Sequence, residues 1–267
     1  ADRAGVRERH RKITEKHGAP SADNVFRVLR AVYNRGLREH PDLPSNPTTN
    51  VDYHGLRRRK VEVEAERLRA WGKAVLGLHP VRRDLHLFMI LTGMRRTSAC
   101  EARASELDLG ARRLHVPKPK GGAARAFDLP LSGPLADLLG HRLAENPKLH
   151  RKSPWLFPAD SKSGHVAEVA QHELDGLTGH ALRHTYATLA LQAGVPIAEL
   201  KFLLNHAAGN VTMGYLNPTL DHLRGYQEKA SAYVLDALGL EWTEGQWPPL
   251  LATTPAEAAS INEFEVA

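Results

Sequence analysis

The sequence predicts a mainly helical α+β fold with one small antiparallel sheet. Apolar residues recur every three or four positions over residues 24–39 and 180–190, which is the period of an amphipathic helix. Apolar and polar residues alternate over residues 112–132 on both sides of Gly121 and Gly122, and this pattern predicts a β-hairpin. A chain of 267 residues can bury a full core, so we expect one large domain with smaller appendages.

The first predicted element is the helix at residues 24–39. Its apolar and basic residues fall on different sides, with the apolar ones at Phe26, Leu29, Val32 and Leu37 and the basic ones, available to phosphate, at Arg27, Arg30, Arg35 and Arg38. A basic run at residues 57–60 follows Pro44, Pro47 and Gly55. We interpret this run as part of a linker between two domains.

The charge is unevenly distributed along the chain. The net charge is +6, but the Asp and Glu residues within 230–267 number six and no Lys or Arg occurs there. Residues 1–229 therefore carry 36 Lys and Arg against 24 Asp and Glu, a net charge of +12. Such a balance is typical of nucleic-acid binding, in which neutralised phosphates supply affinity that weakens with salt.

The composition also excludes several classes of protein. The single cysteine, Cys100, excludes a disulfide framework and a cysteine-rich zinc site, and favours a reducing cytoplasm. No window approaches 18 consecutive apolar residues, and the start lacks a secretory core. Fifteen histidines are present without a His-Glu-x-x-His motif, and no glycine-rich phosphate loop occurs. We therefore expect neither a metal nor a cofactor.

Four polar residues near the C-terminal end could surround one phosphodiester. His180 and Arg183 lie three positions apart and share a face of a helix that Gly194 ends. A second helix over residues 197–204 delivers His206 at its end. Tyr215 follows on a short helix, for which Asn210 is a suitable N-cap and Pro218 the stop.

The spacing of these residues resembles the C-terminal signature of the tyrosine recombinase (phage integrase) family. HALR at residues 180–183 matches the family's His-x-x-Arg, LLNH matches its Leu-x-x-His, and Tyr215 lies nine residues after His206. The segment LFMILTGMRRTSACEARASELDL resembles the block that carries the family's first arginine, and assigns that role to Arg95. Ser98 and Ala104 depart from the acidic residue and the tryptophan that the family often has there.

The resemblance also implies a catalytic lysine on the predicted hairpin. In the family this lysine lies shortly before a Pro-Leu element such as Pro130-Leu131. Lys120, beside the glycine turn, is the first candidate. Lys118 is the alternative, because this hairpin is about two residues longer than the family pattern.

The chemistry of these groups is complementary. Forming the phenolate of Tyr215 at pH 7 costs about 4 kcal/mol, and a phosphodiester repels the anion. Arg95 and Arg183 can donate paired hydrogen bonds to the phosphate and lower the phenol's pKa, while His206 adds a third donor. His180 remains as the proton acceptor or an orienting group, and Lys120 as the acid for the departing 5′ oxygen. The resemblance implies a 3′-phosphotyrosyl intermediate that needs neither metal nor ATP.

The resemblance covers residues 20–220 and implies the integrase catalytic fold and site-specific DNA recombination. We expect a partial helical core-binding domain at 1–52, a basic linker at 53–64 and a catalytic domain at 65–220. A C-terminal helix at 221–238 is expected to dock on a neighbouring protomer or on its own domain. We expect an acidic, partly disordered tail at 239–267.

The expected partners are double-stranded DNA with specific sites, further copies of the chain in a tetramer, and accessory DNA-bending proteins. Two alternatives remain open at this point. A type IB topoisomerase would use a similar set of groups to relax supercoils as a monomer. A DNA-binding relative could have kept the fold and lost catalysis.

Overall fold

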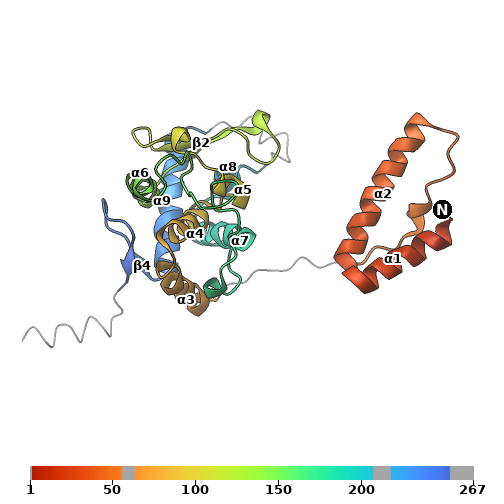
Figure 1. The fold of residues 1–267 in the computed structure, drawn as a ribbon, viewed down its shortest axis with the longest axis horizontal. Helices are drawn as coiled ribbons and strands as arrows, with labels where there is room; N and C mark the ends of the chain where they lie inside the picture. The colour runs from red at the N-terminus through yellow and green to blue at the C-terminus, as the bar shows by residue number, and fades with distance from the viewer. Residues whose placement is uncertain (1, 56–63, 207–217, 253–267) are drawn as a thin grey trace, which may run out of the picture. The chain divides into compact units, whose positions relative to one another are not determined.

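The computed structural model describes residues 2–55, 64–206 and 218–252. The chain divides into two compact units, Ala1–Lys60 and Val61–Ala267, each with its own core (Figure 1). The boundary falls within the residues expected to form a linker. The predicted basic run at residues 57–60 lies outside the described residues.

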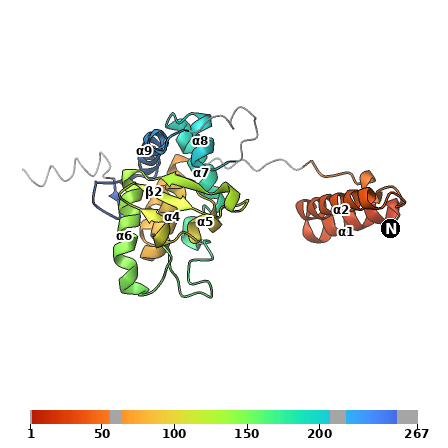
Figure 2. The same cartoon turned by 90° about the horizontal axis from the view of Figure 1, so that it is seen from above.

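The N-terminal unit is a helical hairpin closed by a short return segment. It contains α1 (Arg3–His17), α2 (Ala19–Glu39) and the 3₁₀ helix η1 (Pro47–Asn50) (Figure 2). The predicted helix at residues 24–39 is confirmed within α2. Helix α1 was not predicted, because few apolar residues mark a face along it, and only Val6 and His10 are buried.

The structure corrects part of the predicted helix's apolar face. Phe26 is buried with Val6 and Val51, but Leu29 is 41% and Val32 63% exposed. The basic side is also only partly available. Arg30 donates to the Thr48 carbonyl and its guanidinium stacks 4.8 Å from the centre of the Tyr53 ring.

The C-terminal unit is built around one helix that is buried along most of its length. In α4 (Pro80–Thr92) each residue from 85 to 92 has 0% exposure, as expected of a helix surrounded by other elements. Figure 1 shows α4 at the centre of this unit. The helices that surround it are α3 (Ala65–Leu76), α6 (Gly133–Leu149), α7 (His180–Gln192) and α9 (Leu220–Ala237).

The sheet of this unit has the order β1-β2-β3 and is antiparallel, with strands β1 (Leu107–Asp108), β2 (Arg113–Val116) and β3 (Phe127–Pro130). The predicted hairpin is confirmed, with Leu114 opposite Leu129 and Val116 opposite Phe127. Its connection is longer than the predicted glycine turn, because Pro117 and Pro119 lack the N–H that would continue the ladder. Residues 117–126 form a loop that includes the 3₁₀ helix η3 (Ala123–Arg125).

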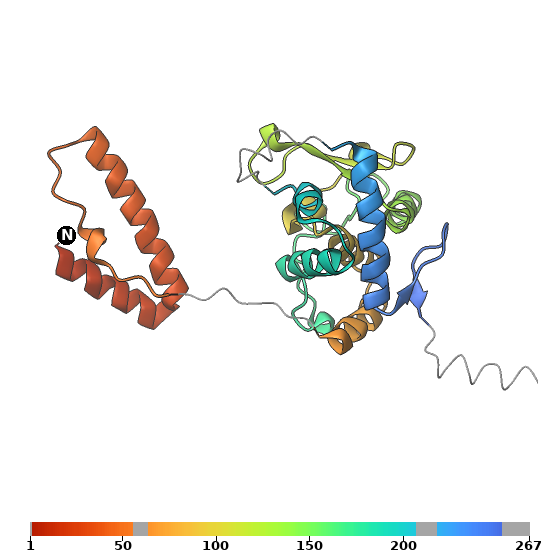
Figure 3. The same ribbon diagram turned by 180° about the vertical axis from the view of Figure 1, so that it is seen from behind.

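Three short elements complete the end of the unit that carries this loop. Helix α5 (Arg96–Cys100) and the 3₁₀ helix η2 (Ala104–Glu106) precede the sheet, and α8 (Ile197–Leu203) follows α7 (Figures 1 and 3). The predicted helices at 180–190 and 197–204 are confirmed. Helix α7 is bounded by Gly179 and Gly194, with φ of +54° and +81°, and Gly194 is the end that the sequence predicts.

Helix α9 packs on its own unit. Gln227 is fully buried; its Nε2 donates to the Leu91 carbonyl at 2.7 Å, and its Oε1 accepts from the Tyr186 hydroxyl at 2.9 Å. Helix α9 therefore belongs to the core of its own unit, and docking on a neighbouring protomer stays a prediction. Figure 3 shows α9 running along the unit, with β4 (Leu240–Glu241) following it.

Residues 239–252, the described part of the expected acidic tail, form ordered structure. Strand β4 pairs with β5 (Leu250–Leu251). The indole N–H groups of Trp242 and Trp247 donate to Asp137 at 3.0 Å and Asp84 at 2.9 Å. Residues 253–267 lie outside the described part. Within the described residues, no helix is long and apolar enough to cross a membrane.

Replacing Gly93 with alanine is expected to lower the free energy of unfolding by about 3 kcal/mol, combining a left-handed backbone with overpacking. Gly93 ends α4 at φ +60°, and a Cβ there would lie 2.3 Å from Tyr186 Cδ1 and 2.7 Å from Leu204 Cδ2. Urea unfolding measures the change. Gly225→Ala in α9 is the control, since its Cβ meets nothing within 4 Å. Equal midpoints for Gly93→Ala and wild type would contradict the prediction.

Candidate active site

The predicted site residues come from five segments of the C-terminal unit. Arg95 precedes α5, Lys120 lies in the β2–β3 loop, and His206 follows α8. His180 and Arg183 lie on the first turn of α7. Tyr215 lies outside the described residues.

Arg183 is held in place by the protein backbone. Its side chain is 5% exposed, and its Nη1 and Nη2 donate to the carbonyls of Gly93 at 2.7 Å and Leu204 at 2.8 Å. Burial, and then the charge of Arg95, lower the pKa of Arg183 to about 10, so the guanidinium is still charged at neutral pH. These two hydrogen bonds use two of the five N–H groups of the guanidinium and fix the direction in which the other three point.

Arg95 lies beside Arg183 at the same cleft. The cleft is small and is also lined by Ser98, Pro119 and Leu203. The only hydrogen bond that the Arg95 side chain makes within the described residues is a long one, from Nη1 to the Asn205 carbonyl at 3.5 Å. Its side chain is half-buried. Two guanidinium groups thus meet at one place although 88 positions separate them in the sequence.

The two histidines lie at the exposed edge of this cluster. Burial, and next the charge of His184, lower the pKa of His180, with smaller contributions from Arg183, Arg95 and Lys120. Burial also lowers the pKa of His206, followed by the charges of Arg183 and Arg95. Both imidazoles are therefore neutral at pH 7. A neutral His180 can accept a proton, and a neutral His206 can still donate one N–H hydrogen bond.

The cluster has an excess of positive charge. Among the described residues, none of the ion pairs involves Arg95, Lys120, His180, Arg183 or His206. Grouping cations without carboxylates is electrostatically unfavourable unless an anion binds there. The arrangement therefore suits a phosphate group, to which arginines can donate paired hydrogen bonds.

The two lysine candidates face different surroundings. Lys120 is exposed in the β2–β3 loop, and its charge is among those that lower the pKa of His180. Lys118 lies in a separate hollow with Ser98, Glu101 and Trp155. Proximity to His180 favours Lys120, and its role stays a prediction.

A model of the phage integrase family matches residues 77–222, which is more than half of the chain. The chain belongs to the phage integrase family. Its match contains every residue proposed for the site, including Tyr215. The family signature was recognisable in the sequence because the spacing within each block is local.

Two curated members of the family show how far the similarity extends. Prophage integrase IntF of Escherichia coli (strain K12) is 28% identical over 189 residues, covering 67% of this chain and 40% of that protein. Tyrosine recombinase XerA of Thermococcus onnurineus is 30% identical over 165 residues, covering 56% of each. The chain thus spans about half the length of these relatives.

Solved integrase structures share the fold. The Tn1549 transposon integrase in complex with a circular intermediate DNA has a TM-score of 0.61 and 17% identity, with 85% of each chain covered. A lambda integrase tetramer bound to a Holliday junction has a TM-score of 0.61 and 16% identity, covering 79% of this chain and 66% of that one. The predicted integrase catalytic fold is confirmed.

The structure adds two residues to which the sequence analysis gave no role. His184 lies one turn after His180 on α7, with its ring edge-on at 4.6 Å. Asn205 has φ +44°, and its Nδ2 donates to the Arg125 carbonyl at 3.1 Å. Asn205 thus ties the loop that carries Lys120 to the end of α8. An asparagine directly after a predicted helix was the available signal.

Replacing Asn205 with glycine is expected to release the Lys120 loop while keeping the left-handed backbone. The hydrogen bond from Asn205 to the Arg125 carbonyl contributes about 1 kcal/mol net against opening of this loop. Without it the open form should be roughly fivefold more populated, and tryptic cleavage after Lys120 and Arg125 should be faster by the same factor. Timed proteolysis of the folded protein measures this rate. Cleavage after Arg151, exposed and distant in sequence, is the internal control. An unchanged rate at the loop would show that the Asn205 side chain does not restrain it.

Proposed function

We propose that this integrase family member is a site-specific DNA recombinase that cleaves and rejoins DNA through Tyr215. The observation that carries the proposal is the meeting of Arg95 and Arg183 at one cleft, with His180, His206 and Lys120 around it and no carboxylate paired to them among the described residues. A scissile phosphodiester supplies the anion that this cluster lacks.

The first step transfers the 3′ phosphoryl group of the cleaved DNA strand to the protein. The Tyr215 oxygen attacks phosphorus, the bond from phosphorus to the 5′ oxygen breaks, and a 3′-phosphotyrosyl bond forms. The phenol's proton passes to His180, which its lowered pKa keeps neutral and able to accept it. Lys120 protonates the departing 5′ oxygen, and both arginines with His206 stabilise the charge on the phosphorane oxygens.

Rejoining reverses these steps with a 5′-hydroxyl from the same or another strand. That hydroxyl attacks the phosphotyrosine, and the phenol regains its proton. One phosphate ester replaces another at each stage, so the bond energy is conserved. Neither ATP nor a metal ion is required for the balance of atoms or charge.

The proposed partners follow from charge and from the related structures. Residues 1–229 carry a net charge of +12, which suits a DNA backbone. The lambda integrase neighbour is a tetramer bound to a Holliday junction, and the Tn1549 integrase is bound to a circular intermediate DNA. We extend DNA binding and tetramer assembly on paired sites to this chain, with DNA-bending proteins as accessories.

Covalent capture of DNA tests the proposal. Duplexes selected by binding from a random-sequence pool are nicked near the bound region and incubated with the protein in EDTA. We expect a protein-DNA adduct that survives denaturation, because the nick lets the 5′-terminal fragment diffuse away. Demonstrated binding without any adduct would overturn the enzymatic proposal and favour a DNA-binding relative.

A second assay separates recombination from supercoil relaxation. Two duplexes that carry the selected site, one of them labelled, are incubated together with the protein. A recombinase transfers label between duplexes. Relaxation of a supercoiled plasmid that lacks the site, without label transfer, would instead indicate topoisomerase activity.

A further inference from the structure

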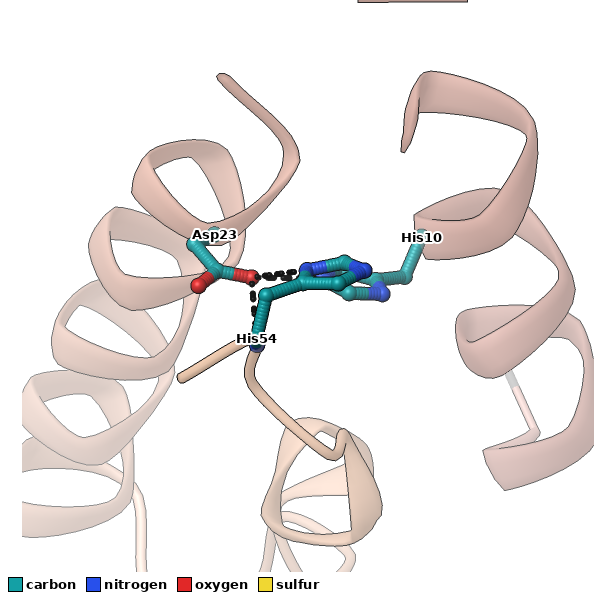
Figure 4. A group of neighbouring side chains, drawn as sticks. All are labelled: His10, Asp23 and His54. Atoms are coloured by element: carbon teal, nitrogen blue, oxygen red, sulfur yellow. Dashed lines mark hydrogen bonds and ion pairs between the residues drawn. The ribbon is translucent and has the colours of Figure 1, made fainter. Parts of the chain in front are cut away.

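Two histidines and an aspartate meet in the N-terminal unit, apart from the candidate active site. His10 on α1 and His54 after η1 approach the same carboxylate oxygen of Asp23 on α2 (Figure 4). Asp23 Oδ1 lies 3.0 Å from His10 Nε2 and 2.9 Å from His54 Nδ1. The two imidazole rings are stacked with their centroids 5.1 Å apart.

The environment of Asp23 is unusual for a group with no metal bound. Its side chain has 0% exposure, yet Oδ2 has no hydrogen-bond partner among the described residues. The nearest cation, the Arg27 guanidinium, is 3.8 Å from Oδ2 on an exposed side chain. All the hydrogen bonds of this carboxylate go to the other oxygen, from the two imidazoles and the His54 N–H. A buried carboxylate oxygen without a hydrogen-bond partner is rare in folded proteins, and a bound ion is one way in which such a group is satisfied.

The donor atoms have the spacing of a coordination shell. All three lie within 4.8 Å of one another. Nitrogen and oxygen ligands bind zinc at about 2.0–2.2 Å, which places neighbouring ligand atoms about 3–3.5 Å apart. Small side-chain rotations could therefore bring the three donors around one ion. The side chain of His54 is 37% exposed, which leaves room for water as a fourth ligand.

We propose that His10, Asp23 and His54 form a structural binding site for one divalent transition-metal ion, with zinc the best match to two imidazoles and a carboxylate. The ion joins α1, α2 and the return segment after η1. It takes no part in the reaction proposed for Tyr215. Asp23 is 13 positions from His10 and 31 from His54, so the three residues do not form a short motif that could be recognised in the sequence.

The N-terminal unit has a small apolar core, so a bound ion would add to its stability. Its buried apolar cluster consists of Val6, Phe26 and Val51, with Ile13 and Tyr53 packed against it. Folded units of about 60 residues are only marginally stable, and a structural metal ion is one of the additions that stabilise small domains. The three ligands come from the three segments that this core must hold together.

Cobalt binding to the whole chain provides the test. The protein is freed of metal with a chelator and titrated with Co²⁺, whose visible absorption reports coordination by protein ligands, and then with Zn²⁺. We expect one Co²⁺ per chain, displaced by Zn²⁺, and thermal unfolding of the N-terminal unit about 10–20 °C higher at a hundredfold excess of zinc over Kd. Absence of saturable Co²⁺ absorption in the wild-type chain would overturn the proposal.

Matched variants locate the site. His54→Gln is expected to weaken zinc affinity at least about 100-fold, and His40→Gln, at an exposed histidine of the same unit, to leave it unchanged. His54 is half-exposed, and unchanged circular dichroism would confirm that the variant is folded. Binding that survives His54→Gln but disappears in His180→Gln would also overturn the proposal, because it would place the ion at the imidazoles of the C-terminal unit.

Discussion

Replacing Tyr215 with phenylalanine is expected to abolish the covalent protein-DNA adduct while leaving DNA affinity within about twofold. The change removes one oxygen atom, and that oxygen is the proposed nucleophile. A phenyl ring cannot form a phosphate ester, so the loss should be complete. In the proposed site the phosphate is bound by Arg95, Arg183 and His206, so affinity for DNA should be retained.

The matched control is Tyr186→Phe, which removes the same atom from the tyrosine that lies on α7. Tyr186 is fully buried and donates to Gln227 Oε1 at 2.9 Å, and burial raises the pKa of its phenol. It is therefore unsuited to attack DNA. Tyr186→Phe should still form the adduct, with a free energy of unfolding about 1–2 kcal/mol lower because a buried acceptor loses its donor.

The adduct is detected by its shift in a denaturing gel, with binding measured separately by titration of labelled duplex. An adduct that persists in Tyr215→Phe and disappears in Tyr186→Phe would reverse the assignment of the nucleophile. An adduct that persists in both would place the nucleophile on another residue.

Replacing Arg183 with lysine is expected to slow DNA cleavage about 1,000-fold, as removal of a fixed oxyanion donor does in other enzymes. The guanidinium of Arg183 donates to the carbonyls of Gly93 and Leu204 and presents its other N–H groups toward the cleft. An ammonium group keeps the charge but cannot reach two carbonyls and a phosphate in one plane. The free energy of unfolding should also fall by about 1–3 kcal/mol, because a buried carbonyl loses its donor.

Arg96→Lys is the matched control for Arg183→Lys. Arg96 is the next residue after Arg95, is exposed, and also donates to a backbone carbonyl, that of Ala167 at 2.9 Å. Its replacement should change the cleavage rate by less than about threefold, because an exposed hydrogen bond contributes little. Single-turnover cleavage of a nicked duplex measures both rates. Equal rates for Arg183→Lys and Arg96→Lys would mean that Arg183 has no special role at the phosphate.

Much of the C-terminal unit could be predicted from local pattern. A helix was predicted at α7 (His180–Gln192) because residues 180–190 have helical period and Gly194 follows them, and the β2–β3 pairing followed from alternation. Helix α1 escaped prediction because only two of its residues are buried. The hairpin turn was predicted too short, since two prolines end β2 before the glycine pair.

The ordered segment after α9 shows a limit of prediction from amino-acid composition. Its acidic composition predicted partial disorder over residues 239–267, yet Trp242 and Trp247 hold residues 240–251 on the unit through buried or partly buried aspartates. Composition averages over a segment, whereas two indole hydrogen bonds are specific contacts. Their acceptors, Asp137 and Asp84, are more than 100 positions away in the sequence.

The sequence by itself determined the family and predicted the set of reacting groups, because each block of the signature has a fixed local spacing that can be recognised without a structure. Only the tertiary structure decided which of these groups lie close together in space. It placed Arg95 beside Arg183, gave Asn205 its contact with the Lys120 loop, buried Tyr186, and brought His10 and His54 to Asp23. The physical reason is that contacts between distant segments depend on how helices pack, and packing is decided by the shape of the whole core rather than by the spacing within one segment.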